Sequence, residues 1–525
     1  MPAKIRFLYF LPLILLFGYG LKRSLSVPAS DFAAYYTGSR DILHGRYERV
    51  YDLRSLNADV LAGGHSGNFV SYAPFPPFTV MVFAPFLLLP MVAAKVLFNV
   101  VSFLLFLLTL WRCSRVFSLQ PLLILLTPVV FLIPIVNNLA FGQAYLLLCC
   151  LLLEGWLAYR EQRVFAASFF WGVAILFKLT PAFLFVFLLL RRRYRQAMIL
   201  ACVCGILLGL CVWVTGFGVW KFYITDILPK MGRGELNDSF TYIFQSAFML
   251  LKRVFLYDGL LNPHPVYYSP WLFVATMAAF KALILTPVVI LTLRGRDEFF
   301  SFGVWVLASM LISPNGSSYS LVVLVIPLWA LASVGRARLA MGLALLGVAC
   351  FLAVSRWGGH AVWAQFPRLY LLLGFFLLLV TQVDRVWNGW LLVAMGLCFY
   401  CLDARRYLRS QETGSYVLDR EQHLFIYDYT VKNGRLVYYF QDDKGEGEQE
   451  TGIVAGALTE EGLNIRNNQI YYKGVALTSS PDWKAKPRLL DGRTIVYLSD
   501  EDRGIGFYTL RQISPNSEAV RGSSR

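Results

Sequence analysis

The chain is poor in charged residues. Only 15% of its 525 residues are Asp, Glu, Lys or Arg, whereas 57% are hydrophobic, and the mean hydropathy is +0.56. A soluble domain of this length needs far more polar surface than this composition supplies. The composition therefore excludes an ordinary soluble enzyme and predicts an integral membrane protein.

Residues that build metal sites and disulfides are also scarce. The chain has five histidines and nine cysteines, and every cysteine precedes residue 402. Cys398 and Cys401 have C-x-x-C spacing within an apolar run, which favours small lipid-compatible side chains over a redox pair. The sequence contains no phosphate-binding loop, no dinucleotide-binding glycine motif, no G-x-S-x-G and no H-E-x-x-H. We therefore expect no metal and no cofactor.

The charge that is present is unevenly distributed. Residues 1–402 hold 31 Lys and Arg against 14 Asp and Glu, whereas residues 403–525 hold 17 against 18. In the first part, basic residues recur at alternate gaps between apolar runs: Lys4, Arg6, Arg112, Arg115, Arg160, Arg163, Arg191, Arg192, Arg193, Arg195, Arg294, Arg296, Arg336, Arg338 and Arg385. This is the positive-inside pattern of cytoplasmic loops. The net charge of +16 therefore indicates membrane topology, and nucleic acid binding is not expected.

Apolar runs predict a polytopic α-helical membrane protein with about 11–13 transmembrane helices. The runs cover residues 5–21, 92–111, 119–136, 144–159, 164–177, 179–190, 197–215, 271–293, 300–313, 321–334, 339–354, 369–383 and 386–402. Lys22 and Arg23 follow the first run without a small-residue cleavage site, which predicts a retained helix rather than a signal peptide. With Lys4 and Arg6 in the cytoplasm, an odd number of spans places the C-terminal region outside.

This topology places residues 22–91, 137–143, 216–270 and 355–368 on the outer face. The first outer segment contains amphipathic stretches at 32–43 and 53–61, which predict helices lying in the membrane interface. The sequence YAPFPPF at residues 72–78 then predicts an extended corner. Such a corner at membrane depth must be buried in protein or line a cavity, so Tyr72 is a candidate site-lining residue.

The sequence changes character after residue 402. Alternating apolar runs at 423–429, 435–440, 468–472 and 494–498 are separated by Asn-Gly, Lys-Gly and Asp-Gly pairs, which predict strands joined by hairpins. We therefore expect two domains: a transmembrane domain at 1–402 and a small all-β extracytoplasmic domain at 403–525. Residues 480–510 resemble a propeller blade, although about a hundred residues are too few to close a propeller.

Asp31 is the strongest candidate for chemistry. It lies a few residues after the first span and is flanked by Phe32, Tyr35 and Tyr36. Apolar and aromatic neighbours can adjust the pKa of a carboxylate for proton abstraction. The alternative is a helix N-cap, because Asp or Ser directly before an amphipathic helix is a common capping arrangement. The spacing leaves both roles open.

Three more residues on the outer side are candidates. Gln143 would be costly in lipid, so it should face a polar cavity. Lys178 lies at an outer turn, where the positive-inside rule places no cation; it suits a phosphate at the membrane surface, and a snorkelling side chain is the alternative. His44 precedes Gly45, a predicted helix stop, so it either contacts the helix end or binds a ligand.

The motifs together resemble glycosyltransferase family 87, membrane enzymes of the GT-C class that include polyprenol-phosphate-mannose-dependent α-mannosyltransferases. The elements that carry the resemblance are Asp31 with Tyr35; Leu43, Gly45, Tyr51 and Asp52; residues 72–78; Gly142 with Gln143; residues 178–181; and Ser313 with Pro314. Two positions depart from the family pattern. Ala144 stands where members often have Asn, and residues 315–320 stand where Trp and His usually follow.

The resemblance implies transfer of a hexose, with mannose as the expected sugar, from a polyprenyl-phosphate donor to an extracytoplasmic glycan or glycolipid acceptor. It implies that Asp31 is the general base, while position points to Lys178 for the donor phosphate; Tyr35, Tyr72, Gln143 and His44 are expected to line the site. Expected partners are membrane lipid, the lipid-linked sugar, the acceptor and a protein bound by the β domain. The expected location is the inner (plasma) membrane of a bacterium, with the site facing the periplasm.

Two other functions stay open at this point. A transporter or flippase of a lipid-linked saccharide would carry internal repeats with paired broken helices, and the sequence shows no convincing repeat. A non-enzymatic membrane scaffold would use its β domain to bind a partner.

Overall fold

The computed structural model describes residues 9–27, 30–63, 70–72, 75–236, 240–258, 261–295, 297–381, 388–408, 414–418, 425–442, 445–480, 482–500, 506 and 508–515. Of the residues used above, Lys4, Arg6, Arg296 and Arg385 lie outside the described part, as do residues 73–74 of the predicted corner.

Each predicted span coincides with one helix or with two consecutive helices. They are α2 (Leu11–Ser26), α7 (Met91–Val116), α8 (Pro121–Val130) with α9 (Leu132–Phe141), α10 (Tyr145–Arg160), α11 (Val164–Phe177), η2 (Thr180–Ala182) with α12 (Phe183–Leu190), α13 (Tyr194–Thr215), α17 (Pro270–Arg294), α18 (Glu298–Leu311), η4 (Ser318–Leu324) with α19 (Val325–Leu331), α20 (Arg336–Phe351), α21 (Pro367–Val380) and α22 (Gly389–Tyr407).

Short helices occupy the segments predicted between spans on the outer face. They are α3 (Asp31–Leu43), α4 (Tyr47–Tyr51), α5 (Leu53–Ala62), α6 (Thr79–Phe83), η1 (Ala84–Leu88), α14 (Phe217–Phe222), the π-helix η3 (Tyr223–Ile227), α15 (Leu228–Gly232), α16 (Ala247–Phe255), η5 (Val354–Trp357) and η6 (Val362–Gln365).

The helices differ in whether they are long enough to cross a membrane. Within the described part of the chain, α7, α13 and α17 are each long and apolar enough to cross a membrane, and α8 with α9 forms a further candidate bent by 53°. Several other apolar helices have 10–17 residues, fewer than the ~20 that a straight crossing needs. The protein is mostly helical with several apolar helices, and the number of crossings stays a prediction.

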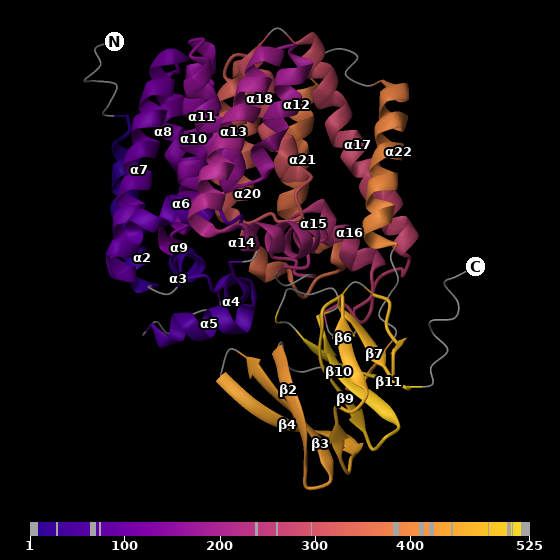
Figure 1. Ribbon diagram of the computed structural model, residues 1–525. Helices are drawn as coiled ribbons and strands as arrows, with labels where there is room; N and C mark the ends of the chain where they lie inside the picture. Colours follow the sequence, from indigo (N-terminus) through magenta and orange to yellow (C-terminus); the bar gives the residue numbers. More distant parts are fainter. Residues whose placement is uncertain are drawn as a thin grey trace.

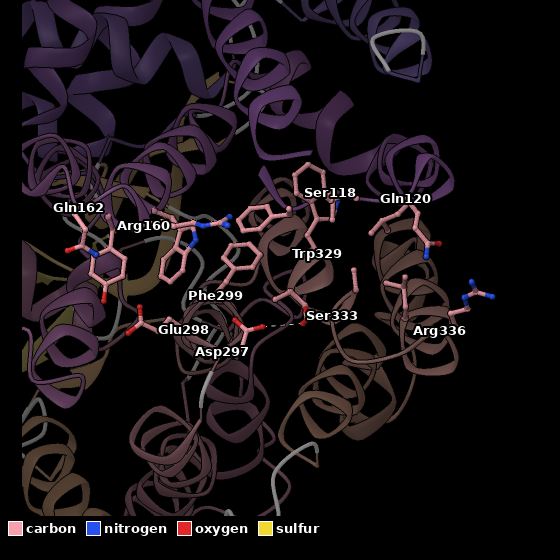
Figure 2. A pocket seen from close by; sticks show the side chains of 18 residues that line it. Ser118, Gln120, Arg160, Gln162, Asp297, Glu298, Phe299, Trp329, Ser333 and Arg336 are labelled. Atoms are coloured by element: carbon pink, nitrogen blue, oxygen red, sulfur yellow. Dashed lines mark hydrogen bonds between the residues drawn. The ribbon is translucent and has the colours of Figure 1, made fainter. Parts of the chain in front are cut away.

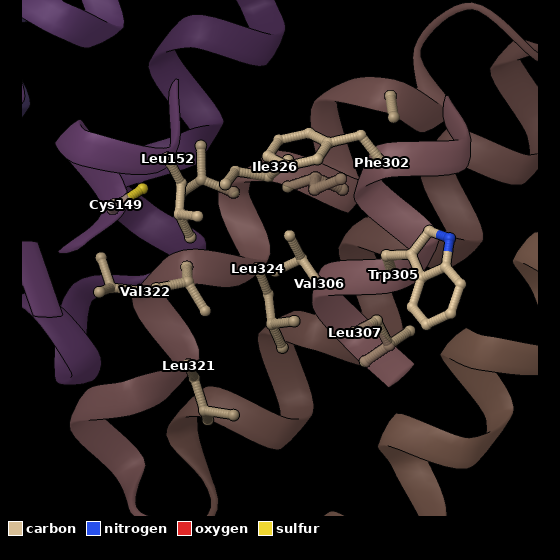
Figure 3. Packing of buried hydrophobic residues seen from close by; sticks show 14 of the residues in the cluster. Cys149, Leu152, Phe302, Trp305, Val306, Leu307, Leu321, Val322, Leu324 and Ile326 are labelled. Carbon is tan, nitrogen blue, oxygen red and sulfur yellow. The ribbon is translucent and has the colours of Figure 1, made fainter. Parts of the chain in front are cut away.

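The interior of the helical part is a packed apolar core. Figure 3 shows Cys149 and Leu152 of α10 close to side chains of α18, η4 and α19. Gly303 of α18 lets α19 approach closely, because a Cβ at this glycine would lie 3.0 Å from the Cα atom of Pro327. This packing fixes the ends of α10 and η4, which carry Tyr145 and Tyr319.

The two ends of the helical part contain different residues. At one end, the loops predicted to be cytoplasmic meet: an Arg191 guanidinium nitrogen lies 3.3 Å from the Glu298 carboxylate, and the rings of Phe117 and Phe299 stack at 4.1 Å. The predicted outer helices α3, α4, α14, α15 and α16 lie at the other end, beside the β strands (Figure 1). The helical part therefore separates the residues as the charge pattern predicts.

Helix α3 is more enclosed than a helix lying on a membrane surface would be. Phe32, Tyr35 and Ile42 are buried, and so is Asp41, which pairs with Arg46 at 2.5 Å. Helices α6 and α7 cover α3, since the Phe32 ring lies 5.8 Å from Phe83 and 5.7 Å from Phe98. The expectation of an interfacial helix therefore does not hold for α3.

The C-terminal region is all β. Its strands are β1 (Ser415–Tyr416), β2 (Phe425–Lys432), β3 (Arg435–Asp442), β4 (Gly445–Val454), β5 (Leu458–Thr459), β6 (Leu463–Arg466), β7 (Gln469–Tyr472), β8 (Val475–Ala476), β9 (Lys484–Leu490), β10 (Thr494–Ser499) and β11 (Thr509–Ile513). They form sheets of order β1-β11-β10-β9-β5, β2-β3-β4 and β6-β7-β8. Among the described strands no four-stranded propeller blade occurs, so the blade resemblance has no counterpart.

The turn between β2 and β3 has the predicted hairpin conformation. Asn433 and Gly434 both have positive φ, at 52° and 75°, as the predicted two-residue hairpin turn requires.

The boundary between the helical part and the β region lies later than residue 402, because α22 continues to Tyr407. Asp403 extends this helix by pairing with Lys281 of α17 at 2.6 Å.

Candidate active site

Asp31, Tyr35 and Gln143 form one hydrogen-bonded group. Asp31 is the first residue of α3, and Tyr35 lies one turn later on the same face. The Gln143 side-chain amide donates to a carboxylate oxygen of Asp31 at 2.5 Å, and the Tyr35 hydroxyl donates to the Gln143 carbonyl at 2.8 Å. Gln143 is thus buried with its polar atoms satisfied, and it links α3 to the turn before α10.

Backbone geometry around the turn explains how Gln143 reaches Asp31. Gly142 has a left-handed φ of +64° and ends α9. The Ser30 hydroxyl donates to the Phe141 carbonyl at 2.9 Å, which joins the start of α3 to this turn. No side-chain capping hydrogen bond is present at the start of α3. The geometry does not support the capping role, and the Asp31 carboxylate faces Gln143.

Lys178 provides positive charge beside this group. It ends α11 in an extended conformation, with φ −143°. Its ammonium nitrogen lies 4.3 Å from the ring centroid of Phe75 and 4.6 Å from that of Tyr145. Among the described residues it has no carboxylate within 4 Å. The ammonium is therefore held by aromatic faces and can still bind an anion.

The environment raises the pKa of Asp31. Burial has the largest effect, because it disfavours the charged carboxylate; the Gln143 hydrogen bond and the charges of Lys178 and Lys95 oppose it. Burial also raises the pKa of the Tyr35 hydroxyl well above its ordinary value, so this hydroxyl keeps its proton. The group therefore contains a carboxylate with increased proton affinity beside a fixed hydrogen-bond donor.

Lys95 is a buried cation that the sequence analysis did not identify. Its ammonium donates to the carbonyls of Val27 at 2.6 Å and Ala140 at 2.7 Å, which lie at the ends of α2 and α9. It thereby holds together the two segments that lead to Asp31 and Gln143. The available signal was a single lysine inside a long apolar run.

Two predicted site residues lie away from the carboxylate. Tyr72 is buried behind Phe75, with ring centroids 5.9 Å apart, and forms a second layer. His44 lies at the far end of α3, where its exposed ring is 2.6 Å from the Arg40 carbonyl. His44 therefore lies at the helix end. The structure does not bring it to Asp31, Tyr35, Gln143 or Lys178.

Residues 315–320, which depart from the family pattern, contribute to the wall of this site. The Asn138 amide donates to the Tyr319 carbonyl at 2.8 Å, and the rings of Tyr319 and Tyr145 lie 5.5 Å apart. A small hollow of about 50 Å³ adjoins them, lined in part by Tyr145, Ser313 and Asn315. Across the described residues, no three His, Cys, Asp or Glu side chains gather as metal ligands.

Comparison with protein families gives one match, over part of the chain. The model of glycosyltransferase family 87 matches residues 73–314, a segment that contains Gln143 and Lys178 and begins after Asp31. None of the curated proteins compared with the chain matches it. The family match supports glycosyltransferase activity in general and is consistent with the GT-C superfamily. Over residues 73–314, the chain is therefore similar to glycosyltransferase family 87.

Proposed function

We propose that the protein transfers a hexose, with mannose as the expected sugar, from a polyprenyl-phosphate carrier to a glycan or glycolipid acceptor outside the cytoplasm. The observation that carries the proposal is the half-buried Asp31 carboxylate, bonded to Gln143 and close to the charge of Lys178, in a chain whose residues 73–314 match family 87. A lipid-borne sugar phosphate needs a base for the acceptor hydroxyl and a cation for the leaving phosphate, and this site supplies both.

In the proposed reaction, Asp31 removes the proton of the acceptor hydroxyl as that oxygen bonds to the anomeric carbon. The bond between this carbon and the phosphate oxygen breaks, and the electron pair leaves with the polyprenyl phosphate. Lys178 contacts the phosphate and stabilises its developing charge. Attack opposite the leaving group inverts the anomeric configuration. Gln143 and Tyr35 orient the carboxylate without taking its proton.

We further propose a multi-pass protein of the bacterial inner membrane, with a cytoplasmic N-terminus and an extracytoplasmic β region. The several apolar helices support membrane insertion, and the basic loops at the end opposite Asp31 support this orientation. In this topology the carboxylate lies near the outer headgroups, where a lipid-linked donor would present its sugar.

Substitution of Asp31 tests the proposal most directly. Asp31→Asn keeps the side-chain volume but removes the base, so transfer from a polyprenyl-phosphate hexose should fall by roughly 10²–10⁴-fold. Purified protein in lipid nanodiscs is assayed for transfer, after mass spectrometry of envelope glycolipids with and without the gene has identified the missing hexose and its acceptor.

Asp226→Asn is the matched control, because Asp226 is a partly exposed carboxylate in η3 that bonds to Thr225 and lies outside the site. The control should keep full transfer. If Asp31→Asn also keeps full transfer from the polyprenyl-phosphate hexose, Asp31 is not the base. Movement of an unaltered lipid-linked saccharide across the membrane, unaffected by Asp31→Asn, would instead indicate a transporter.

A further inference from the structure

A cavity of about 550 Å³ lies at the end of the helical part opposite Asp31. The residues that line it come from the ends of α7, α10 and α19 and the starts of α8, α18 and α20: Phe117, Ser118, Leu119, Gln120, Leu123, Trp156, Tyr159, Arg160, Gln162, Asp297, Glu298, Phe299, Trp329, Ala330, Ala332, Ser333, Arg336 and Leu339. Its volume falls within the range of small-ligand sites, roughly 300–1,000 Å³. The proposed transfer uses none of these residues.

Among the described residues, three charged side chains of the cavity lining have no ionic partner: Arg160, Arg336 and Asp297. The Arg160 guanidinium donates to the Val116 carbonyl at 3.3 Å, and Asp297 accepts from the Phe300 amide at 3.0 Å and the Ser333 hydroxyl at 3.2 Å. Within the described ranges, neither has an oppositely charged side chain within 4 Å. Figure 2 shows Arg160 and Asp297 on opposite sides of Phe299.

The other carboxylate of the lining differs from Asp297. Glu298 lies 3.3 Å from an Arg191 guanidinium nitrogen and 3.8 Å from one of Arg193, so its charge is already compensated. Arg336 is the second cation of the lining. Arg160 and Asp297 are both exposed, and their charges are available to a charged ligand.

A buried donor and an apolar wall complete the site. Trp156 is only 3% exposed, and among the described residues its indole N–H has no hydrogen-bond acceptor. Buried donors usually have an acceptor, and a ligand oxygen in the cavity that Trp156 lines would supply one. Leu119, Leu123 and Leu339 supply apolar surface beside these polar groups.

We propose that this cavity binds the headgroup of an aminophospholipid from the inner leaflet. The phosphate oxygens accept from Arg160 and from the Trp156 indole, and the primary ammonium donates to Asp297. The leucine side chains contact the glycerol and the first acyl carbons. The site goes beyond the proposed transfer reaction, and it rests on the membrane orientation proposed above.

Native mass spectrometry of the full-length protein in detergent tests this site with four probes: phosphatidylethanolamine, phosphatidylglycerol, phosphatidylcholine and water-soluble glycerophosphoethanolamine. Phosphatidylethanolamine should bind at least tenfold more tightly than each of the others, because only it combines a primary ammonium, a phosphate and acyl chains. Equal binding of the three lipids, or tightest binding of phosphatidylglycerol, overturns the proposal. Equal binding of the water-soluble probe overturns the assignment to a lipid.

Two variants separate the contributions of the two charges. Arg160→Gln should weaken all three lipids about tenfold, whereas Asp297→Asn should remove only the preference for phosphatidylethanolamine. Asn can still accept the Phe300 amide at the start of α18, so this helix should remain capped. Arg163→Gln is the control, because Arg163 pairs with Glu161 at 2.6 Å and lies outside the cavity lining.

Unchanged lipid binding in both variants, at an unchanged melting temperature, would contradict the site. The binding assay requires no sugar transfer, so an Asp31→Asn protein should bind phosphatidylethanolamine like the wild type. Failure of the proposed transferase function and failure of this lipid site are therefore distinguishable.

Discussion

At the scale of single residues, the proposed chemistry depends on the protonation of Asp31. Burial raises the pKa of its carboxyl above the ordinary value near 3.9, so at a given acidic pH more of it is protonated than of an exposed aspartate. A general base acts only when unprotonated. The acid limb of the pH profile for transfer should therefore lie at higher pH than an exposed aspartate would give, and activity should decrease as the pH falls through the raised pKa.

The measurement is kcat/KM for transfer across pH 4–8, compared between wild type and Gln143→Leu. The variant removes the hydrogen bond that favours the charged carboxylate, so it should move the acid limb to higher pH. An unchanged limb in the variant would show that the titrating group is not Asp31.

Lys178 allows a second test at this scale. Lys178→Ala removes the ammonium held over Phe75 and Tyr145, and a lost charge-assisted contact to phosphate is worth ~1.5–3 kcal/mol. The kcat/KM for the lipid donor should therefore fall by roughly 10- to 100-fold, with a much smaller change in the acceptor KM. The control is Lys221→Ala, an exposed outer lysine. Equal effects on donor and acceptor would argue against phosphate contact.

The residues of this site were only partly predictable from sequence. Asp31, Gln143 and Lys178 could be found because each is a polar residue at the end of an apolar run. Lys95 and Tyr319 could not, because their roles depend on carbonyls and rings contributed by other helices. His44 was placed too close, since the predicted helix over residues 32–43 already separates it from Asp31 by ~20 Å at 1.5 Å per residue.

At the scale of elements, span positions were predictable because hydropathy is a local property. The enclosure of α3 was not, because it depends on Phe83 and Phe98, which are more than 50 residues later in the chain. The turn between α9 and α10 depends both on its local sequence and on a contact that is distant in the chain. Its glycine ends a helix, as the sequence suggests, and it also contacts α3.

Gly142 should therefore tolerate no side chain. A left-handed conformation costs a non-glycine residue ~1–2 kcal/mol, and a Cβ here would lie 2.6 Å from the Cβ atom of Phe32. Gly142→Ala should lower thermal stability and reduce transfer, because it moves Gln143 away from Asp31. Gly205→Ala is the control, since a Cβ at Gly205 meets no atom within 4 Å. Wild-type stability and activity in Gly142→Ala would contradict this role.

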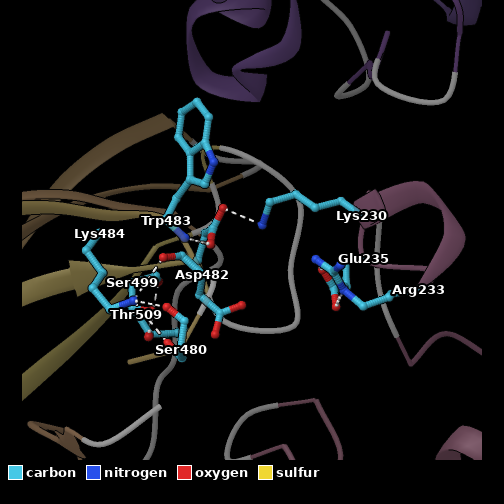
Figure 4. Close-up of polar contacts among 10 residues, drawn as sticks. Lys230, Arg233, Glu235, Ser480, Asp482, Trp483, Lys484, Ser499 and Thr509 are labelled. Atoms are coloured by element: carbon cyan, nitrogen blue, oxygen red, sulfur yellow. Dashed lines mark hydrogen bonds and ion pairs between the residues drawn. The ribbon is translucent and has the colours of Figure 1, made fainter. Parts of the chain in front are cut away.

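At the scale of the whole molecule, the β region is attached to the outer helices by specific contacts. Lys230 of α15 donates to the Asp500 carboxylate at 2.8 Å, and both side chains are buried (Figure 4). Nearby, the Trp483 ring lies 5.7 Å from Phe222 of α14. The Arg54 guanidinium of α5 lies 3.5 Å from the Tyr427 ring centroid of β2. Sequence predicted the strands but gave no sign of this docking, which joins residues hundreds of positions apart.

Asp500 makes the stability of this attachment depend on pH. Burial raises the pKa of Asp500 to about 6, against the opposing charge of Lys230. Because the folded-state pKa exceeds the unfolded one, the stability that Asp500 contributes is complete below about pH 4 and is lost as the pH rises through about 6. The difference amounts to about 3 kcal/mol at most.

Asp500→Asn isolates this effect. Asn retains an acceptor for the Trp483 amide, which bonds to Asp500 at 2.7 Å, and like protonated Asp500 it carries no charge. The stability of the variant should therefore not fall as the pH rises through about 6, and at pH 7 its β region should be no more sensitive to limited proteolysis than that of the wild type. The melting temperature of the wild type should fall between pH 4 and pH 6.5 relative to that of the variant, because only the wild type has the titrating carboxylate. Arg233→Gln is the control, since Arg233 pairs with Glu235 within the outer segment (Figure 4). A parallel pH dependence in wild type and Asp500→Asn would exclude Asp500 as the group that couples docking to pH.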